Sequence, residues 1–516
     1  MTSLTNSINI GVIGAGAMGA GIAQVAAQSG HQVTLYDNRE GAAQEAIEKI
    51  AKQLSRLVER QKMTADAVDR TLAHLHPANT LDDFADAGLV IEAIVENIDV
   101  KQAVFSSLET ICSADCILAS NTSSISITRL AAGMAHPERF VGMHFFNPAP
   151  IMKLVEVVSG LMTAGHVAET VYHTAHQWGK KPVYAASTPG FIVNRVARPF
   201  YAESLRLKQE GVADCATLDA LIRGAGGFRM GAFELTDLIG HDVNYAVTCS
   251  VFDAYYGDFR FQPSLIQKEL VEAGMLGRKS GQGFYSYGED ATLPAVQYCP
   301  VSDSQIDPAS LASDCVVSGD LGVLAPLTDR LSASLGQALS VSSTKSKVGV
   351  LRIGDANLVL TDGRMACERA QAEQLDNLIL VDLALNYDTT THLALSRAFG
   401  VSDHVFQQAV DGFALMGVQV SEVTDSPGLV VMRTVAMLAN EAADAALNGV
   451  ASVSDIDTAM TFGVNYPIGP LAWGDRLGVS SILTTLNHLQ QAYGEDRYRA
   501  SLLIKKLATE GRGFHE

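Results

Sequence analysis

INIGVIGAGAMG, at residues 8–19, is the stretch of this 516-residue chain that decides its fold. Its first half is a short apolar run rich in β-branched residues, which is typical of a buried parallel strand. Its second half is a G-x-G-x-x-G turn, and the Ala-rich residues 20–29 continue it with a helical pattern that Gly30 is placed to end. Residues 32–36 form a second apolar run, so this region predicts a strand–turn–helix–strand unit.

Each glycine of this turn has its own physical task. Gly14 permits the tight turn, Gly16 lets the backbone approach a pyrophosphate, and Gly19 lets the helix pack closely on the strand. The pyrophosphate is expected at the helix N-terminus, where free N–H groups and the helix dipole favour an anion. Asp37 ends the second strand and would bind both ribose hydroxyls while repelling a 2′-phosphate, which predicts NAD rather than NADP. The alternatives are a glycine turn without a ligand and an exposed strand-end carboxylate.

Composition places the chain among ordinary globular proteins. It is 47% hydrophobic and 18% charged, and its length predicts about three domains. The net charge of -19 argues against nucleic acid or an anionic membrane as a partner. Seven scattered cysteines without a C-x-x-C pair indicate reduced thiols, and no metal site is predicted. Because neither a signal peptide nor an apolar run of ~18 residues is found, a cytoplasmic location is expected.

Strands and helices alternate through the rest of the first domain. Helices are expected at residues 40–61 and onward to 74, and strands at residues 89–94, 116–120, 139–146 and 153–159. This alternation predicts a doubly wound α/β sheet of the Rossmann type over residues 1–186, with its ligand beyond the carboxyl ends of the strands. Polar groups follow three of those ends, at residues 96–101, 121–124 and 144–148.

His144 and Glu156 form the pair of greatest chemical interest. The strands that carry them flank the turn NPAP at residues 147–150. If these strands pair antiparallel about that turn, His144 and Glu156 become direct cross-strand partners. A carboxylate on one imidazole nitrogen fixes the tautomer and leaves the other nitrogen to accept a proton, so His144 is the predicted base. The alternative is a satisfied structural histidine.

A change of character follows residue 186. Thr188 and Pro189 are a helix-start signal, and helices are predicted to dominate residues 187–290 as an all-α domain. Within it, single helices are expected at residues 191–209, 216–222, 236–256 and 263–273. Asn194 lies one turn into the first helix, where it is either a functional amide or a helix-surface residue.

The helical domain is predicted to be duplicated. PGFIVNR at residues 189–195 recurs as PGLVVMR at 427–433, and the offset of 238 residues continues to Gly240 and Gly478. The second copy is placed at residues 425–516. Because Met432 replaces Asn194 there, we interpret that copy as structural, completing or mimicking a dimer interface.

Two further segments are expected between the copies. Residues 291–320 contain Ser, Asp and Pro and are predicted to be a linker. Residues 321–424 alternate apolar strands, at 348–353, 358–360 and 378–383, with helical stretches, which predicts a degenerate α/β domain. No G-x-G-x-x-G turn opens this domain, so no cofactor is assigned to it.

The chain resembles the 3-hydroxyacyl-CoA dehydrogenase family over residues 8–287, and the long two-copy bacterial form of that family over nearly its whole length. The matching stretches are GAGAMGAG (14–21), VEN (95–97), SNTSS (120–124), HFFNP (144–148), KLVEV (153–157), PGFIVNR (189–195) and GRKSGQGFY (277–285). The resemblance implies a catalytic set of Ser123, His144, Glu156 and Asn194, of which Ser123 and Asn194 also contact substrate. It implies that NAD is further contacted by Glu96, Lys101, Asn121 and Lys279. The alternatives are a solvated pair for Glu96 and Lys101, and a surface charge for Lys279.

One motif departs from the family pattern. Short members carry YPMGP where this chain has FRMG at residues 228–231, and only the second copy keeps the usual form, as YPIGP at 466–470. The FRMG variant is similar to long forms, among them the 3-hydroxyadipyl-CoA dehydrogenases of phenylacetate breakdown. Arg229 is either a contact for a distal carboxylate or a surface residue. Candidates for the CoA phosphates are Lys52, Arg56, Arg60 and Lys62, whose alternative is a solvated helix face.

The resemblance implies NAD-dependent oxidation of a (3S)-3-hydroxyacyl-CoA to a 3-ketoacyl-CoA, in β-oxidation of fatty acids or in phenylacetate catabolism. Candidate substrates are 3-hydroxyadipyl-CoA and 3-hydroxybutyryl-CoA. Two alternatives remain: a non-catalytic NAD-binding structural protein, and a dehydrogenase of free β-hydroxyacids, which would need a Lys where this helix offers none before Lys208. A homodimer or higher homo-oligomer is expected, with acyl-CoA as the partner molecule.

Overall fold

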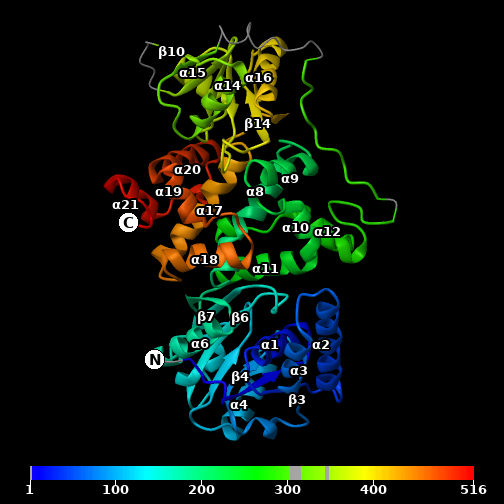
Figure 1. The fold of residues 1–516 in the computed structure, drawn as a ribbon. Coiled ribbons are helices and arrows are strands. Elements are labelled where there is room, and N and C mark those ends of the chain that lie inside the picture. Colours follow the sequence, from blue (N-terminus) through cyan, green and yellow to red (C-terminus); the bar gives the residue numbers. More distant parts are fainter. Residues whose placement is uncertain (1–2, 290, 303–314, 343–347) are drawn as a thin grey trace. The chain divides into compact units, whose positions relative to one another are not determined.

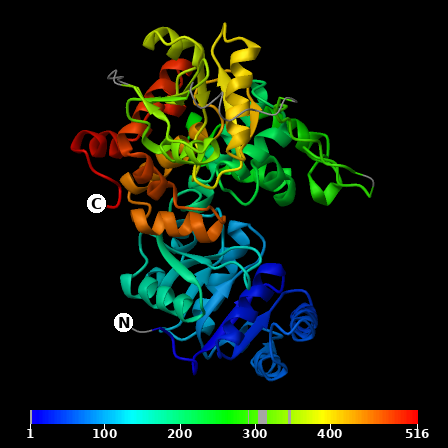
Figure 2. The ribbon, with the colours of Figure 1, turned by 45° about the horizontal axis from the view of Figure 1, so that its top comes forward.

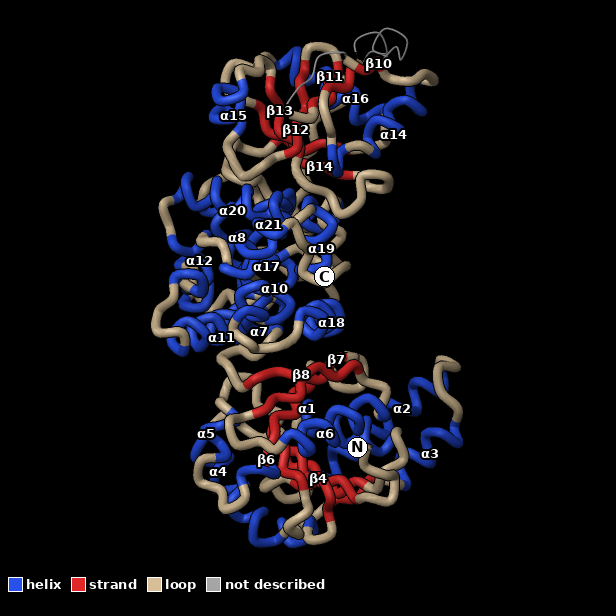
Figure 3. Tube along the Cα trace, turned by 90° about the vertical axis from the view of Figure 1, so that its left-hand side faces the viewer, coloured by secondary structure: helices blue, strands red, loops and turns tan. Residues whose placement is uncertain are grey.

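A computed structural model of the chain describes residues 3–289, 291–302, 315–342 and 348–516. The chain forms two compact units. The first consists of Met1–Arg195 and Ala445–Asn465, and the second consists of Val196–Asp444 and Tyr466–Glu516. Each unit holds a β-sheet of its own, drawn in red in Figure 3.

The sheet of the first unit has the strand order β3-β2-β1-β4-β5-β6-β7-β8. Its strands are β1 (Asn9–Ile13), β2 (Val33–Tyr36), β3 (Leu75–Pro77), β4 (Ala87–Glu92), β5 (Ile117–Ser120), β6 (Phe140–Phe145), β7 (Leu154–Ser159) and β8 (Lys181–Ala186). Neighbouring strands pair parallel, except that β6 and β7 pair antiparallel. The predicted doubly wound Rossmann-type sheet is confirmed, and the sequence reading missed only the short β3 and the amphipathic β8 within it.

Helices cover both faces of this sheet. They are α1 (Ala17–Gln28), α2 (Ala42–Glu59), α3 (Ala65–Ala73), α4 (Ile98–Ile111), α5 (Ile127–Ala131) and α6 (Gly165–Gln177). The apolar sides of α1, α2, α3 and α6 form one core with the central strands, where Ile22 and Val171 are fully buried. On α4, Phe105 packs edge-on against Phe140 of β6 with the ring centres 4.7 Å apart. The sheet is therefore buried on both faces, as its continuous apolar strands require (Figure 1).

A segment of the second helical copy belongs to the first unit, which corrects the predicted linear boundaries. Helix α18 (Val453–Gly463) packs on β7 and β8. The N–H of Ala186 donates to the Val450 carbonyl at 2.8 Å, and the Lys181 ammonium lies 5.8 Å from the centre of the Phe462 ring. The unit also extends to Arg195, nine residues past the boundary predicted at residue 186.

The first helical copy departs from prediction at two breaks. Its helices are α7 (Val193–Val196), α8 (Arg198–Gln209), α9 (Cys215–Gly224), α10 (Ala232–Ile239), α11 (His241–Ala254) and α12 (Leu265–Glu272). The helix predicted from residue 191 begins later, because Gly190 and Phe191 have φ values of 76° and 47°. The helix predicted at 236–256 is two helices, separated by Gly240 with φ 98°. These left-handed residues cannot continue a right-handed helix.

The second copy repeats these breaks. Its helices are α17 (Val431–Leu447), α18, α19 (Pro470–Leu477), α20 (Val479–Tyr493) and α21 (Leu502–Glu510). Leu429 has φ 51° and Gly478 has φ 83°, at the positions that correspond to Phe191 and Gly240. The predicted duplication therefore extends to the backbone conformation of individual residues.

Within the second unit, the two copies pack on each other. The Arg433 guanidinium of α17 donates to Glu203 of α8 and to Glu210 just after that helix, at 2.8 Å in each case. The Tyr466 ring lies 5.7 Å from the Phe200 ring and 5.0 Å from the Phe228 ring, between ring centres. One chain thus supplies both sides of an interface between helical domains, as the interpretation of the second copy anticipated.

The second sheet has the order β10-β9-β11-β12-β13-β14-β15. Its strands are β9 (Val316–Ser318), β10 (Ser340–Val341), β11 (Val350–Ile353), β12 (Ala356–Leu360), β13 (Leu378–Val381), β14 (His392–Arg397) and β15 (Gln419–Glu422). The helices α14 (Pro326–Leu335), α15 (Ala366–Glu373) and α16 (Asp403–Leu415) pack around it (Figures 1 and 2). The predicted degenerate α/β domain is confirmed.

The predicted linker at residues 291–320 needs correction at both ends. Strand β9 lies inside that range and pairs with β11. At the other end, the N–H of Cys299 donates to the Val420 carbonyl at 2.7 Å, so this segment runs along the second sheet. The central part, residues 303–314, lies outside the described residues.

The second sheet repeats the carboxyl-terminal half of the first. Strands β6 and β13, β7 and β14, and β8 and β15 each begin 238 residues apart, the same offset as the helical copies. The duplicated unit is therefore longer than the sequence reading recognised. At this offset, Ser123, His144, Glu156 and Asn194 correspond to Thr361, Asp382, Ala394 and Met432.

Asp382 ties the second sheet to the second helical copy. Its carboxylate accepts hydrogen bonds from the backbone N–H groups of Val430, Val431 and Met432 at 2.8–3.1 Å. Burial raises the pKa of Asp382 to about 6, so the group is ionised at neutral pH and can accept all three.

In the part of the chain that the structure describes, no helix is long and apolar enough to cross a membrane.

Replacing Asp382 should destabilise the second unit. Asp382→Ala leaves four buried N–H groups without their acceptor, those of Val430, Val431 and Met432 and that of Leu383, and we expect a loss of at least about 2 kcal/mol in the free energy of unfolding. Urea denaturation followed by circular dichroism measures this loss. Asp388→Ala, which removes an exposed carboxylate of the same domain, is the control. Equal stability of the two variants would contradict this role of Asp382.

Candidate active site

The glycine turn after β1 has the geometry that its sequence predicts. Gly14 has φ +103°, a conformation that side chains rarely adopt. A Cβ atom on Gly19 would lie 1.7 Å from the Gly14 carbonyl oxygen, so only glycine allows α1 to approach the strand. A Cβ on Gly16 would meet nothing within 4 Å, which leaves open space before the first turn of α1.

This turn fits the pyrophosphate and ribose of a dinucleotide. Helix α1 begins at Ala17 after the N-cap residue Gly16, without a side-chain cap and without an acidic residue in its first turn. Its free N–H groups and dipole are therefore available to an anion. Asp37 is fixed beside the turn, because its two carboxylate oxygens accept from the N–H groups of Ala15 at 2.7 Å and Arg39 at 3.0 Å.

His144 and Glu156 are direct cross-strand partners on β6 and β7, which confirms the predicted register. The His144 Nδ1 atom lies 2.6 Å from Glu156 Oε2, and both side chains are buried. Because the carboxylate accepts at Nδ1, that nitrogen carries the proton and Nε2 presents its lone pair. The pair has the arrangement of a general base and its orienting acid.

The other oxygen of Glu156 connects the pair to the segment before α7. Glu156 Oε1 accepts from the N–H groups of Ile192 and Val193, at 3.0 Å each. Phe191 precedes them, and its ring centre lies 5.8 Å from that of His144. One carboxylate therefore fixes both the imidazole and the backbone next to Asn194, which is half-buried in the same unit.

Glu96 organises the loop after β5. One of its carboxylate oxygens accepts from the Thr122 hydroxyl at 2.6 Å and from the N–H groups of Ser123 and Ser124 at 3.1 Å. Burial alone would raise the pKa of Glu96, but the Thr122 hydrogen bond and the charge of Lys101 lower it overall. Ser123 is thereby held at the carboxyl end of β5, where the sequence placed it.

Lys101 is buried and Asn121 is half-buried. The Lys101 ammonium is 2.6 Å from Glu92 and 3.2 Å from Glu96, and only 1% of the side chain is exposed. The alternative of a solvated pair is wrong for Lys101. The Asn121 side-chain oxygen accepts from the Phe145 N–H at 2.8 Å and joins the ends of β5 and β6. Contact of these residues with NAD stays a prediction.

Comparisons with known proteins identify the family. The NAD-binding domain of 3-hydroxyacyl-CoA dehydrogenase matches residues 9–188, and the carboxyl-terminal domain of that enzyme matches residues 190–287 and 428–513. The 3-hydroxybutyryl-CoA dehydrogenase reduced Rossmann-fold domain matches residues 358–427. The 3-hydroxyadipyl-CoA dehydrogenase of Escherichia coli K12 is 44% identical over 99% of both chains.

The chain belongs to the 3-hydroxyacyl-CoA dehydrogenase family. It is an NAD-dependent oxidoreductase of that family in the full-length, two-copy form. A crystal structure of a 3-hydroxybutyryl-CoA dehydrogenase from E. coli K12 superimposes with a TM-score of 0.87 at 44% identity, covering 98% of this chain and 99% of that one. A probable 3-hydroxybutyryl-CoA dehydrogenase of Deinococcus radiodurans is 44% identical over its full length and 54% of this chain.

The remaining residues that the sequence predicts for this dehydrogenase are not part of the His144 or Glu96 hydrogen-bond networks. Lys279, in the 3-10 turn η4 (Arg278–Ser280), forms an ion pair with Asp242 inside the second unit. Arg229 is exposed, as its surface alternative requires. Four basic residues on or just after α2 are exposed and stay candidates for the CoA phosphates: Lys52, Arg56, Arg60 and Lys62. Among the described residues, no group of three His, Cys, Asp or Glu side chains is placed to hold a metal ion.

Two supporting residues of the dehydrogenase site escaped the sequence reading. Glu92 is fully buried and accepts from Lys101 and from the Ser120 hydroxyl, both at 2.6 Å. Lys180 donates to the carbonyls of Ala149 at 2.5 Å and Met152 at 2.9 Å, and so holds the turn between β6 and β7. Burial, with the charge of Lys153, lowers the pKa of Lys180 to about 8. A charge inside an apolar run was the available signal for Glu92.

Glu156→Gln should impair turnover while preserving the fold. The amide oxygen can still accept from Ile192 and Val193, but the amide nitrogen would donate to His144 Nδ1 and place the ring proton on Nε2. We expect kcat to fall by about 10²- to 10⁴-fold, the range for loss of general base catalysis, with a melting temperature within a few degrees of the wild type. Glu138→Gln, the same change at an exposed carboxylate, is the control. Unchanged kcat in Glu156→Gln would reject the orienting role.

Proposed function

We propose that His144 is the general base that takes the proton from the 3-hydroxyl of a (3S)-3-hydroxyacyl-CoA, and that Glu156 orients it. The observation that carries this proposal is the buried His144–Glu156 pair with Nδ1 and Oε2 at 2.6 Å. Glu156 stabilises the imidazolium that forms when Nε2 accepts the proton. NAD, when bound, supplies the hydride acceptor.

Two polar side chains are proposed to hold the substrate. Ser123 is positioned by the Glu96 network, and Asn194 follows the two N–H groups that Glu156 fixes. Both belong to the first unit together with His144. Their hydrogen bonds to the hydroxyl or to the thioester carbonyl would restrict the substrate to a reactive orientation.

For the dinucleotide, Gly14, Gly16 and Gly19 are proposed to cradle the pyrophosphate and Asp37 to select NAD over NADP. The open space before α1 and the fixed Asp37 carboxylate support this assignment. Glu96, Lys101, Asn121 and Lys279 are kept as further candidates for NAD contacts.

The proposed substrate carries a second, terminal carboxylate, as 3-hydroxyadipyl-CoA does. The E. coli 3-hydroxyadipyl-CoA dehydrogenase matches both copies of this chain from end to end, which supports that choice. The names of the relatives differ in the acyl group, and 3-hydroxybutyryl-CoA is the other candidate. A homodimer or larger assembly stays a prediction, which light scattering would test.

His144→Ala should lower kcat by more than about 100-fold, because a general base contributes at least that much. NAD affinity should be unchanged, since His144 is not part of the glycine turn; fluorescence titration measures it. His173→Ala, at a half-exposed histidine on α6, is the control. Turnover by His144→Ala at a near-normal rate would refute the assignment of the base.

A substrate panel tests the proposed function. The panel contains 3-hydroxyadipyl-CoA, 3-hydroxybutyryl-CoA and free 3-hydroxybutyrate, each assayed at 340 nm with NAD and with NADP. We expect the highest kcat/KM with the adipyl thioester and NAD. Activity confined to the free acid would reject CoA thioesters as substrates, and equal use of NADP would reject the role of Asp37.

A further inference from the structure

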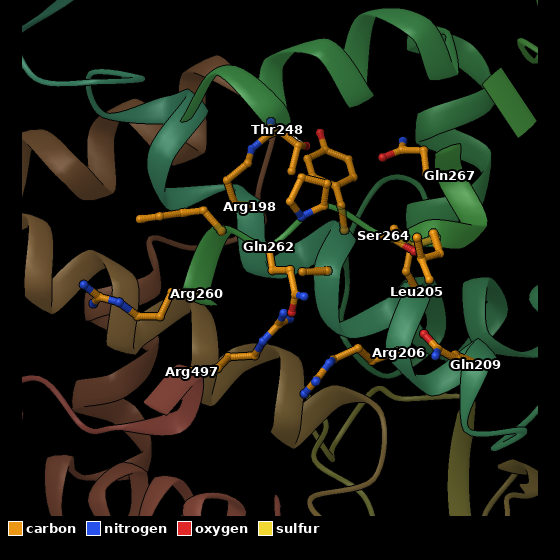
Figure 4. A pocket seen from close by; sticks show the side chains of 15 residues that line it. Arg198, Leu205, Arg206, Gln209, Thr248, Arg260, Gln262, Ser264, Gln267 and Arg497 are labelled. Atoms are coloured by element: carbon orange, nitrogen blue, oxygen red, sulfur yellow. Dashed lines mark hydrogen bonds between the residues drawn. The ribbon is translucent and has the colours of Figure 1, made fainter. Parts of the chain in front are cut away.

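The second unit contains a cavity of about 180 Å³ that is partly open to solvent and lined with arginines (Figure 4). Its wall is formed by α8, α11, α12 and the 3-10 turns η3 (Phe259–Phe261) and η6 (Asp496–Tyr498). Four arginines line it: Arg198, Arg206, Arg260 and Arg497. None of the described lining residues is an aspartate or a glutamate. This positive, donor-rich space lies in a chain whose net charge is -19.

Three of these arginines are neutralised by carboxylates that stand outside the cavity wall. Arg206 Nη2 lies 2.8 Å from Glu495 Oε2, and Arg260 Nη1 lies 2.8 Å from Asp444 Oδ2. Arg497 has two looser partners, Glu203 at 3.7 Å and Glu495 at 3.8 Å, and its buried Nε makes no hydrogen bond to the described residues.

Arg198 is different from the other three. Its side chain is 5% exposed, and its charged group contacts the Thr248 hydroxyl at 3.0 Å and the Tyr201 ring at 4.9 Å. No described carboxylate pairs with it, and its Nε is buried without an acceptor. The Ser264 hydroxyl on the same wall is also buried and unpartnered. A buried guanidinium in this state is destabilising unless an anion binds it.

The fold does not require a cation at this position. In the second helical copy, Ala436 stands at the position of Arg198, and Leu486 stands at the position of Thr248. Both are fully buried, so the second copy fills the same positions with apolar packing. The polar pair of Arg198 and Thr248 is therefore specific to the first copy.

We propose that this cavity is a carboxylate-binding site with Arg198 as its anchor. A guanidinium donates two parallel hydrogen bonds to a carboxylate, which is the best geometric match for this group. The cavity is smaller than the ~300–1,000 Å³ of sites for drug-sized molecules, so it suits a small acid or the end of a chain. It has two sources for that carboxylate: the terminal group of a dicarboxylic acyl thioester, and a free dicarboxylate.

The first source rests on the proposed function, whereas the site itself does not. In sequence, Arg198 follows Asn194 by four residues, so the chain limits their Cα atoms to a separation of at most ~14 Å. Along the chain, the residue proposed to hold the substrate is therefore only four positions before the anchor.

Thermal unfolding with adipate as the probe tests the site without turnover. We expect adipate to raise the melting temperature of the wild-type protein. Arg198→Met should abolish this rise and should itself melt above the wild type without adipate, because it removes an unpaired buried charge. Arg512→Met, at an exposed arginine of the same unit, keeps the wild-type response. A lower ligand-free melting temperature in Arg198→Met, or a retained response to adipate, would overturn the proposal.

Kinetics separates the two sources of the carboxylate. With 3-hydroxyadipyl-CoA, Arg198→Met should raise KM by about 10- to 100-fold, as loss of a buried charged hydrogen bond does. With 3-hydroxybutyryl-CoA, which lacks the carboxylate, its KM and kcat should stay within about twofold of the wild type. Arg198→Lys, which keeps the charge but loses the paired donors, should give an intermediate KM for the adipyl substrate.

Each combined outcome decides. If Arg198→Met raises KM for the adipyl substrate but not for the butyryl substrate, the site binds the terminal carboxylate of the substrate. If adipate stabilises the wild type but Arg198→Met leaves KM for both substrates unchanged, the site binds a free dicarboxylate. Equal effects on both substrates, or neither an adipate response nor a KM effect, would overturn the proposal. If the wild type oxidises neither substrate, the proposed function fails while the adipate experiment still judges the cavity.

Discussion

The carboxylate of Glu156 is the constraint on which the first unit's chemistry depends. One oxygen fixes the tautomer of His144, and the other accepts the two N–H groups that precede Asn194. A single buried carboxylate thereby connects strand β7, the His144 imidazole and the backbone just before α7. The charge is stabilised by three donors, so it serves the fold and the chemistry together.

The second copy solves the same structural problem without a base. Asp382 occupies the position of His144, and it accepts directly from the N–H groups that correspond to those held by Glu156. Because Asp382 accepts these N–H groups itself, no carboxylate is needed at the position of Glu156, where the second copy has Ala394. The junction between sheet and helix survives in the second copy, while the imidazole and the amide of Asn194 are lost. The second copy thus keeps the architecture of this junction without the histidine–glutamate pair.

Local patterns in the sequence were enough for the glycine turn, the parallel sheet and the pairing of His144 with Glu156, because each follows from strand periodicity and a short turn. The boundaries were not predictable in the same way. Ala445–Asn465 joins the first unit through packing on β8, which no local pattern encodes. The buried setting of Lys101 depends on Glu92, a carboxylate that strand periodicity alone treats as an ordinary strand residue. Arg198 was not predicted as a functional residue, because the absence of a carboxylate partner can be seen only in the three-dimensional structure.

The two helical copies meet inside one chain, and this has a genetic consequence. In a dimer of identical subunits every substitution appears twice, once on each side of the symmetry axis. Here position 198 is arginine and its counterpart 436 is alanine, although the same fold surrounds both. Because the two halves share one chain, a substitution in one half does not appear in the other. Evolution could then specialise one half for recognition and the other for support, without a trade-off between them.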